Sequence, residues 1–338
     1  MRRILIAALL LSISAASLAS MGAASPARGA QSPPLRLVST AWPPFTNDSS
    51  PRFALDLVEA ALGRIGMNAK TTIVEPARFT PLLLSSEYDG SGAAWKDGER
   101  EAVLVFSQPY LENRLILVAR RGADVSAASL EALKGKRVAV VLGYAYGDAL
   151  EKSGADLVRS SSEEDSLTLL LAGKTEYALM DELVVQFIVD NYPAESRTKL
   201  SLGTTPLLTR PLHFAIRRSR PDAESIVSRF NAQLRTMISD RTYHRLLHVS
   251  WIRADVDGDG IPELVPRSDQ FGTKAPDRAY TILSTGQPTP KTIEVQPRFY
   301  IGGSIYTDWA SVPNRYKVED PKRPDPSRST ASIFRFTW

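Results

Sequence analysis

Two hydrophobic spacings alternate along residues 35–250, and this alternation predicts an α/β protein. Leu35 to Thr40 is short and rich in β-forming residues, and the prolines of Trp42-Pro43-Pro44-Phe45 force a loop after it. Apolar residues then recur at helical spacing over 53–65 and stop at Gly66, a favourable C-terminal cap. The first unit is therefore a strand, an aromatic loop and a helix.

The later segments repeat this unit and predict two lobes with largely parallel sheets. A second lobe begins near Ser129, and the pattern of the first lobe returns at residue 212. A chain that leaves one lobe, builds another and comes back has two hinge crossovers, and the cleft between the lobes forms a site. We expect lobe I over 31–122 and 208–251 and lobe II over 123–207. Further strands are predicted at 71–74, 90–94, 115–119, 137–142, 156–159, 177–180 and 212–217, and further helices at 129–133, 146–152, 163–172, 182–192 and 223–249.

The composition changes after Trp251, where a C-terminal appendix is predicted. Residues 252–338 are rich in Pro, Gly, Asp and aromatic residues, and they contain one hairpin signal, Gly302-Gly303. We expect a short extension of irregular and β structure that includes a flexible, proline-rich stretch over 319–330.

The first thirty residues have the pattern of a secretion signal. Arg2 and Arg3 precede an apolar core over 4–11, and small residues follow as far as Ala30. A retained membrane anchor is the alternative, although the apolar run is short for a span. The chain has no cysteine, which excludes a lipid-anchored lipoprotein and leaves stability to hydrophobic cores. The expected location is the periplasm, with residues 1–30 as signal peptide.

The formal net charge of +4 overstates the basic character of the exported part. Three of the 41 basic residues and no acidic residue precede residue 31, which leaves 38 against 37, or +1. A nearly neutral surface gives no support to nucleic-acid binding or to stable membrane insertion as the main activity. Neither class of partner is expected.

Five segments along the two lobes form a recognisable ordered set. They are Trp42-Pro43-Pro44-Phe45-Thr46, Glu99-Arg100 followed by Phe106-Ser107-Gln108-Pro109-Tyr110, residues 130–143, residues 167–181, and residues 242–251. Together they resemble bacterial extracellular solute-binding proteins of family 3, the periplasmic polar amino acid-binding group. The resemblance implies the two-lobed periplasmic-binding-protein fold. It also implies capture of a small polar solute, an amino acid or a derivative, by lobe closure, with an inner-membrane ABC permease as partner and without catalysis or a required cofactor.

The resemblance assigns ligand-binding roles to residues on both lobes. Arg100 stands where the family's carboxylate-binding Arg stands, and a planar, permanently charged guanidinium suits a carboxylate. Asp181 matches the family's ammonium-binding Asp, and Trp42 lies in its aromatic slot. Each residue also has a structural interpretation: Arg100 in a solvated charge cluster, Asp181 as a helix cap, and Trp42 as a loop anchor.

Three departures from the family pattern alter the predicted pocket. Asp97 stands where a small hydroxyl residue is usual, and Gly143-Tyr144 replaces the usual Gly-Thr or Gly-Ser. A shortening by one residue places Trp95 near the cleft. An aromatic or a cationic ligand therefore stays open beside a polar amino acid. The predicted ligand-binding residues are Trp42, Trp95, Arg100, Tyr144 and Asp181.

The appendix contains an acidic loop that resembles calcium-binding loops of the EF-hand and integrin-type propeller repeats. Carboxylates at alternate positions can wrap Ca²⁺, Gly260 permits the sharp turn, and a backbone carbonyl can contribute. The twelfth position is Pro266, where an EF-hand needs Glu. A structural calcium ion and a metal-free acidic turn are both open. The predicted metal ligands are Asp255, Asp257, Asp259, Ile261 and Glu263.

Two other functions remain open on the same scaffold. A periplasmic enzyme similar to cyclohexadienyl dehydratases would need a general acid in the cleft, and Asp97 and Asp181 are the motif-linked candidates. An accessory or sensor module would instead serve a periplasmic partner. His244 and His248 stand one helical turn apart, and we interpret them as exposed polar residues because no acid completes a metal-binding pattern.

Overall fold

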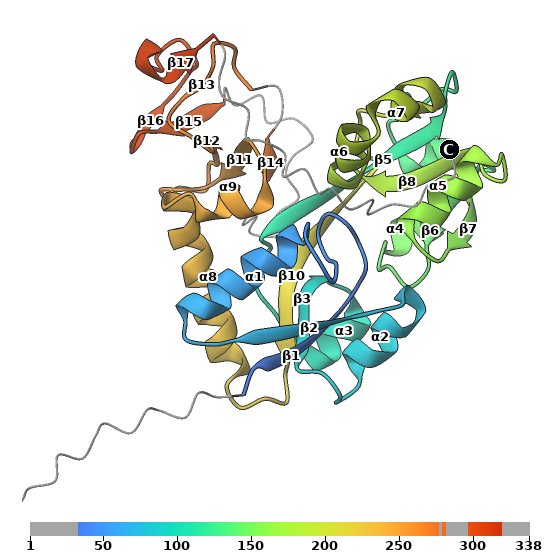
Figure 1. Cartoon of the computed structure of the whole chain (residues 1–338), viewed down its shortest axis with the longest axis horizontal. Helices are drawn as coiled ribbons and strands as arrows, with labels where there is room; N and C mark the ends of the chain where they lie inside the picture. The colour runs from blue at the N-terminus through green and yellow to red at the C-terminus, as the bar shows by residue number, and fades with distance from the viewer. Residues whose placement is uncertain (1–32, 277–278, 282–296, 320–338) are drawn as a thin grey trace, which may run out of the picture. The chain divides into compact units, whose positions relative to one another are not determined.

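The computed structural model describes residues 33–276, 279–281 and 297–319 (Figure 1). The predicted signal peptide and all but the first residue of the predicted flexible stretch over 319–330 lie outside these residues. Within them, strands and helices alternate from β1 (Leu35–Thr40) to α9 (Thr242–Leu247), and short strands follow. The α/β class is therefore confirmed.

Among the described residues, one sheet of ten strands runs through both lobes. Lobe I contains β1, β2 (Ala69–Val74), β3 (Gly90–Trp95) and β4 (Leu104–Phe106), and lobe II contains β6 (Arg137–Val141), β7 (Asp156–Ser160), β8 (Tyr177–Asp181) and β9 (Leu200–Leu202). β1 pairs in parallel with β2 and β3, and β6 pairs in parallel with β7 and β8. These pairs agree with the parallel arrangement that the alternating pattern predicts.

Two long strands, β5 (Leu111–Arg120) and β10 (Leu208–Arg217), connect the lobes. They pair antiparallel over their first halves, with Leu115 opposite Leu208. β10 continues along β3 of lobe I, while β5 continues along β8 of lobe II. The two crossovers are thus neighbouring strands of the continuous sheet. The lobe boundaries at 122/123 and 207/208 stay predictions.

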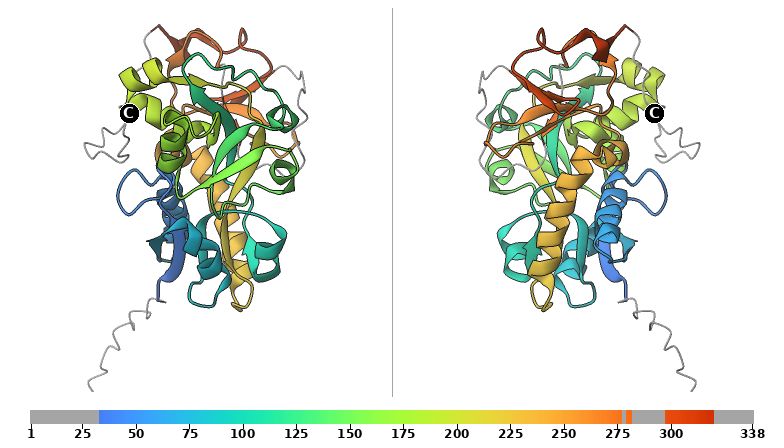
Figure 2. Two further views of the ribbon diagram at one scale, coloured as in Figure 1. Left: turned by 90° about the vertical axis from the view of Figure 1, so that its right-hand side faces the viewer. Right: turned by 90° about the vertical axis from the view of Figure 1, so that its left-hand side faces the viewer.

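Helices pack against the strands of this sheet in both lobes. In α1 (Phe53–Arg64) the buried residues recur at helical spacing, and the chain turns at Gly66 with φ +77°, the left-handed conformation that glycine adopts without strain. Figure 2 shows α8 (Ala223–Ser239) running beside α1. The other helices are α2 (Pro76–Leu84), α3 (Gly98–Val103), η1 (Leu130–Leu133), α4 (Asp148–Glu151), α5 (Glu163–Leu171), α6 (Glu182–Asn191) and α7 (Pro193–Lys199).

The predicted single helix over 223–249 is wrong, because two helices, α8 and α9, occupy this stretch. Arg241 between them adopts a left-handed φ of 64°. The Asp240 carboxylate accepts a hydrogen bond from the Thr242 N–H at 2.9 Å, which starts the new helix. The apolar spacing continues through the break, so the sequence pattern does not reveal it.

The C-terminal extension is a small β structure with its own core. Its strands are β11 (Trp251–Ala254), β12 (Glu263–Pro266), β13 (Phe271–Gly272), β14 (Tyr280–Thr281), β15 (Arg298–Ile301), β16 (Ser304–Tyr306) and β17 (Lys317–Val318), with the short helix η2 (Asn314–Tyr316) before the last of them. The predicted hairpin is confirmed, because Gly302 and Gly303 turn β15 into β16 with positive φ at both residues. Phe271 and Phe299 are buried at the centre of the extension, and Trp309 packs against both rings.

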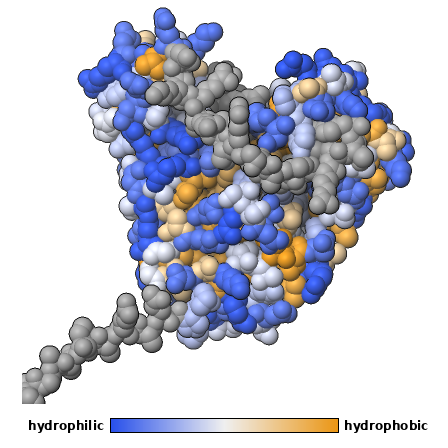
Figure 3. All heavy atoms as spheres, viewed as in Figure 1, coloured by the Kyte–Doolittle hydropathy of each residue, from blue (hydrophilic) through white to orange (hydrophobic). Residues whose placement is uncertain are grey.

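The face in Figure 3 is mostly hydrophilic, with smaller hydrophobic areas between the polar residues. Among the described residues, the large apolar side chains with substantial exposure are Leu142, Ile261 and Ile305. No described helix has both the length and the apolar composition that a membrane crossing needs.

Candidate functional site

The loop after β1 is folded tightly and buries its aromatic residues. The Trp42 N–H donates to the Thr46 carbonyl at 2.8 Å, and the Thr46 hydroxyl donates to the Thr40 carbonyl at 2.6 Å. Trp42 packs on Phe45 with ring centroids 4.6 Å apart. Trp42 therefore anchors its own loop, in agreement with its structural interpretation. It also lines a cavity between the lobes.

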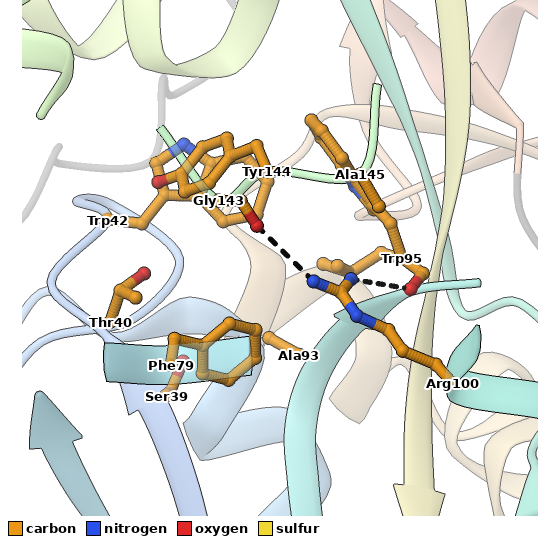
Figure 4. A pocket seen from close by; sticks show the side chains of 11 residues that line it. Ser39, Thr40, Trp42, Phe79, Ala93, Trp95, Arg100, Gly143, Tyr144 and Ala145 are labelled. Carbon is orange, nitrogen blue, oxygen red and sulfur yellow. Dashed lines mark hydrogen bonds between the residues drawn. The ribbon is translucent and has the colours of Figure 1, made fainter. Parts of the chain in front are cut away.

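Arg100 is buried at the start of α3, which excludes the solvated charge cluster. The Asp97 carboxylate caps this helix by accepting the Arg100 N–H at 2.8 Å, and Asp97 Oδ2 lies 3.4 Å from Arg100 Nε. Arg100 Nη1 donates to the Trp95 carbonyl at 2.9 Å, and Nη2 donates to the Thr80 hydroxyl at 2.8 Å and to the Gly143 carbonyl at 3.3 Å (Figure 4). The guanidinium thus joins lobe I to the loop after β6 of lobe II. Burial lowers the pKa of Arg100.

Four aromatic side chains, called here the aromatic cluster, meet between the lobes. Trp42 and Trp95 come from lobe I, and Tyr144 and Tyr146 come from the loop between β6 and α4 of lobe II. Trp95 makes edge contacts with Trp42, Tyr144 and Tyr146, each at 5.5 Å between centroids. Trp42 and Tyr144 are 5.4 Å apart. Edge-to-face geometry at these distances is favourable for aromatic pairs, so the cluster holds the two lobes together.

A cavity beside Arg100 is the space that the aromatic cluster leaves. The volume that the centre of a water molecule can occupy inside it is about 30 Å³, which is enough for a water molecule or two and too little for an amino acid. A ligand that enters the cleft must therefore move aromatic rings aside. The cavity is lined by Ser39, Thr40, Trp42, Phe79, Ala93, Trp95, Arg100, Gly143, Tyr144, Ala145 and Leu212.

Asp181 does not line this cavity. It caps α6 by accepting the Leu183 N–H at 2.8 Å and the Val184 N–H at 3.3 Å, so the predicted helix-capping role is present. Its other oxygen accepts from the Asn113 side chain at 3.0 Å, and the oxygen of the Asn113 amide accepts the Trp95 indole N–H at 2.8 Å. The asparagine on crossover strand β5 thus connects Asp181 of lobe II with Trp95 of lobe I.

Glu163, at the start of α5, is a site residue that sequence reasoning missed. Its side chain is buried close to Asp181 and to the Trp42 indole. Burial and, to a smaller extent, the Asp181 carboxylate raise the pKa of Glu163 to about 8, while the Trp42 indole N–H opposes the change. Burial likewise raises the pKa of Asp181 to about 7. An acid in the first turn of a helix is ordinarily an exposed partner of the helix dipole, so nothing in the sequence distinguishes Glu163.

The acidic loop of the extension gathers around an arginine. Arg298 Nη1 lies 2.6 Å from Asp259 Oδ2, Arg298 Nη2 lies 3.1 Å from Asp257 Oδ2, and Nη2 also contacts the fully buried Glu263. Of the predicted metal ligands, Asp255, Asp257 and Glu263 have oxygens within 4.8 Å of one another. Asp259 lies outside that group, and the Ile261 side chain is exposed.

The interpretation of His244 as an exposed residue is wrong, although His248 is exposed. His244 Nε2 lies 3.1 Å from the Val265 carbonyl, so the ring joins α9 to β12 of the extension. Burial lowers the pKa of His244 to about 4, which keeps the ring neutral. The described residues show no metal-ligating group around it.

Comparison with known proteins identifies the family. Residues 37–253 match the model of the bacterial extracellular solute-binding proteins, family 3. The virulence sensor protein BvgS of Bordetella bronchiseptica is 26% identical over 164 residues, which are 44% of this chain but 13% of BvgS. The ABC transporter arginine-binding protein 1 of Escherichia coli is 24% identical over 221 residues, or 62% of this chain and 86% of that protein.

Solved structures show the same fold. An ancestral arginine-binding protein bound to arginine superimposes with a TM-score of 0.55 at 24% identity, covering 65% of this chain and 98% of that chain. This similarity confirms the two-lobed periplasmic-binding-protein fold. The residues that match the family model make up more than half of the chain and include both crossover strands. This chain belongs to the bacterial extracellular solute-binding proteins of family 3.

Proposed function

We propose that this protein captures a small zwitterionic solute, an amino acid or a derivative, between its lobes in the periplasm and delivers it to an inner-membrane ABC permease. The observation that carries the proposal is the position of buried opposite charges beside the aromatic cluster. The Arg100 guanidinium of lobe I lines the cavity. The buried Glu163 and Asp181 carboxyls of lobe II lie outside its lining, with Glu163 close to the Trp42 indole. A ligand that contacts both lobes has higher affinity for the closed state and so favours closure.

Arg100 can exchange its present partners for a ligand carboxylate. Its terminal N–H groups now donate to two carbonyls and a hydroxyl, and buried Nε lies 3.4 Å from Asp97 Oδ2 without making a hydrogen bond. A ligand carboxylate accepts two parallel hydrogen bonds from a guanidinium and is charged, so it is a stronger partner than the neutral carbonyls and hydroxyl. This exchange breaks the hydrogen bond between Arg100 and the Gly143 carbonyl, which holds the loop that carries Tyr144.

Similarity supports the choice of ligand. The names of the Escherichia coli protein and of the ancestral protein describe arginine binding. Thermal shift of the exported protein against an amino-acid panel tests the proposal, since a ligand at 100 times its dissociation constant adds about 2.7 kcal/mol to the free energy of unfolding. A protein whose unfolding temperature no amino acid shifts would contradict it. Turnover of prephenate-like compounds would instead favour the enzyme, with Asp181 as the acid.

A sensor module is the second candidate, and the similarity to BvgS favours it. In this role the ligand-binding lobes would report on a solute to a periplasmic partner instead of a permease. Pull-down of membrane proteins with the ligand-loaded and ligand-free forms distinguishes the two roles. Enrichment of a permease supports transport, and enrichment of a signalling protein supports sensing.

Ligand binding is expected to depend on pH. A ligand ammonium binds deprotonated carboxylates, while burial raises the pKa values of Asp181 and Glu163 to about 7 and about 8. The free protein therefore holds more protons than the complex, and the dissociation constant is expected to fall as the pH rises from about 6 to about 8, by up to about tenfold per pH unit. Calorimetry in buffers of different ionisation enthalpy measures the released protons. A dissociation constant that stays constant over this range would refute the expectation.

We also propose that the acidic loop can hold a structural calcium ion on Asp255, Asp257 and Glu263. The 4.8 Å limit on their oxygen separations is twice an ordinary Ca²⁺–oxygen distance of about 2.4 Å, so the oxygens fit around one ion. The contacts of Arg298 with Asp257 and Glu263 compete with the metal. Calcium is expected to raise the unfolding temperature and chelation to lower it, with both effects lost in Asp257→Ala. The exposed acid Asp148, changed to Ala, serves as the control, and an equal calcium response in Asp257→Ala would exclude the site.

A further inference from the structure

Glu163 and Asp181 differ in the hydrogen bonds that they already accept. Asp181 accepts two backbone N–H groups of α6 and the Asn113 amide, so the protein itself uses most of its acceptor capacity. Glu163 is 5% exposed, and its Oε2 atom is buried with no hydrogen-bond partner. Of the two carboxyls, Glu163 has the free acceptor.

The neighbours of Glu163 come from both sides of the cleft. The Trp42 indole of lobe I lies close enough to lower its pKa, although neither Trp42 Nε1 nor Glu163 Oε2 reaches hydrogen-bond geometry. The Tyr144 hydroxyl lies beside Thr40; burial raises its pKa, and the charges of Glu163 and Asp181 raise it further. Glu163 therefore lies beside Trp42 and Tyr144 of the aromatic cluster, outside the lining of the cavity that Arg100 borders.

No cation balances this pair of acids within the described part of the chain. The ion pairs there include none to Glu163 or Asp181. Arg159 pairs with Glu151, and Arg100 pairs with Asp97 and donates to carbonyls. Two neighbouring buried carboxyls are unfavourable in the ionised form without a positive partner, so the pair either holds protons or binds a cation. Aromatic rings add to the stabilisation of such a cation, because their faces attract positive charge.

We propose that Glu163 binds a cationic side-chain group of the ligand and makes the cleft selective for organic cations, with the aromatic cluster around that group. This inference rests on the proposed function and narrows its ligand. The ligand's carboxylate lies on Arg100, and its cationic side-chain group lies between Glu163 and the rings of Trp42 and Tyr144. Entry of the cation takes the place of the Trp42 indole N–H, which has no partner now.

Pairs of cationic and neutral ligands of the same shape test the proposal. Calorimetry compares L-arginine with L-citrulline, L-lysine with L-norleucine, and choline with 3,3-dimethyl-1-butanol. The wild-type protein is expected to bind the cationic member of at least one pair at least about tenfold more tightly, since a charge-assisted contact exceeds a neutral one by that much. Glu163→Gln keeps the shape, removes the charge, and is expected to abolish the preference.

Asp181→Asn is the matched variant, because it removes one carboxylate from the same buried pair while asparagine still caps a helix. It is expected to keep the preference for the cation. The proposal is overturned if Glu163→Gln retains the preference, if only Asp181→Asn loses it, or if the wild-type protein binds amino acids without preferring any cation. Absence of binding to every member of the amino-acid panel and every cationic probe is a different result, since it refutes the proposed function and this inference together.

Discussion

Replacing Arg100 with alanine is expected to weaken ligand binding by roughly 100-fold or more. The guanidinium is buried at the cleft, and removal of one partner from a desolvated, hydrogen-bonded charge pair costs about 3 kcal/mol or more. Arg100→Lys keeps the charge but loses the planar pair of donors, so it is expected to restore only part of the affinity. Calorimetric titration with the amino acid that gives the largest thermal shift measures both effects.

Loss of Arg100 also removes structural hydrogen bonds, so a matched control is needed. Arg217 likewise donates to backbone carbonyls, those of Leu83 and Tyr88, but it lies outside the lining of the cavity. Arg217→Ala is expected to lower the unfolding temperature and leave the dissociation constant within about twofold of wild type, a change worth less than about 0.5 kcal/mol. Equal ligand affinity in Arg100→Ala and the wild type would show that Arg100 does not bind the ligand.

Replacing Phe230 with alanine is expected to produce the largest loss of stability among the changes considered. Phe230 of α8 is fully buried and packs on Phe214 of crossover strand β10, with ring centroids 4.8 Å apart. Truncation of a buried phenylalanine costs about 3–5 kcal/mol, which corresponds to a fall of roughly 10 °C in unfolding temperature for a chain of this size. Scanning calorimetry measures the fall. Ile305→Ala, at a side chain that is 37% exposed, should change stability by less than about 0.5 kcal/mol, and a similar loss in both variants would contradict the assignment of the core.

Sequence patterns predict most of the lobes, because those elements follow from local rules. The helix ahead of Gly66 and the Gly302-Gly303 hairpin depend on glycine conformation and hydrophobic spacing, both of which are visible in the sequence. The break at Arg241 depends on a left-handed residue that is neither glycine nor asparagine, together with a hydrogen bond that the Asp240 carboxylate accepts from the Thr242 N–H. Such a break leaves the apolar spacing intact, so the hydrophobic pattern does not reveal it.

The candidate site is only partly predictable from the sequence, because it combines residues of both lobes that are far apart along the chain. Arg100 and Trp42 lie in segments with recognisable motifs, and the structure brings them to one cavity with Trp95 and Tyr144. Glu163 comes from α5, outside those segments, and its neighbours Trp42 and Asp181 belong to different lobes. Arg298 reaches the acidic loop from more than thirty positions away along the chain. No local rule in the sequence connects either residue to its site.

The hydrogen bonds of Asn113 give the protein an optical reporter of its cleft. The Trp95 indole donates to Asn113, and Asn113 donates to Asp181, so the electronic environment of this indole changes when Asp181 gains or loses a proton or when β5 bends. Trp42 and Trp95 also lose their edge contact if the lobes separate. Intrinsic tryptophan emission is therefore expected to report a separation of the lobes without an attached dye, and Trp95→Phe identifies the part of the signal that comes from the Trp95 indole.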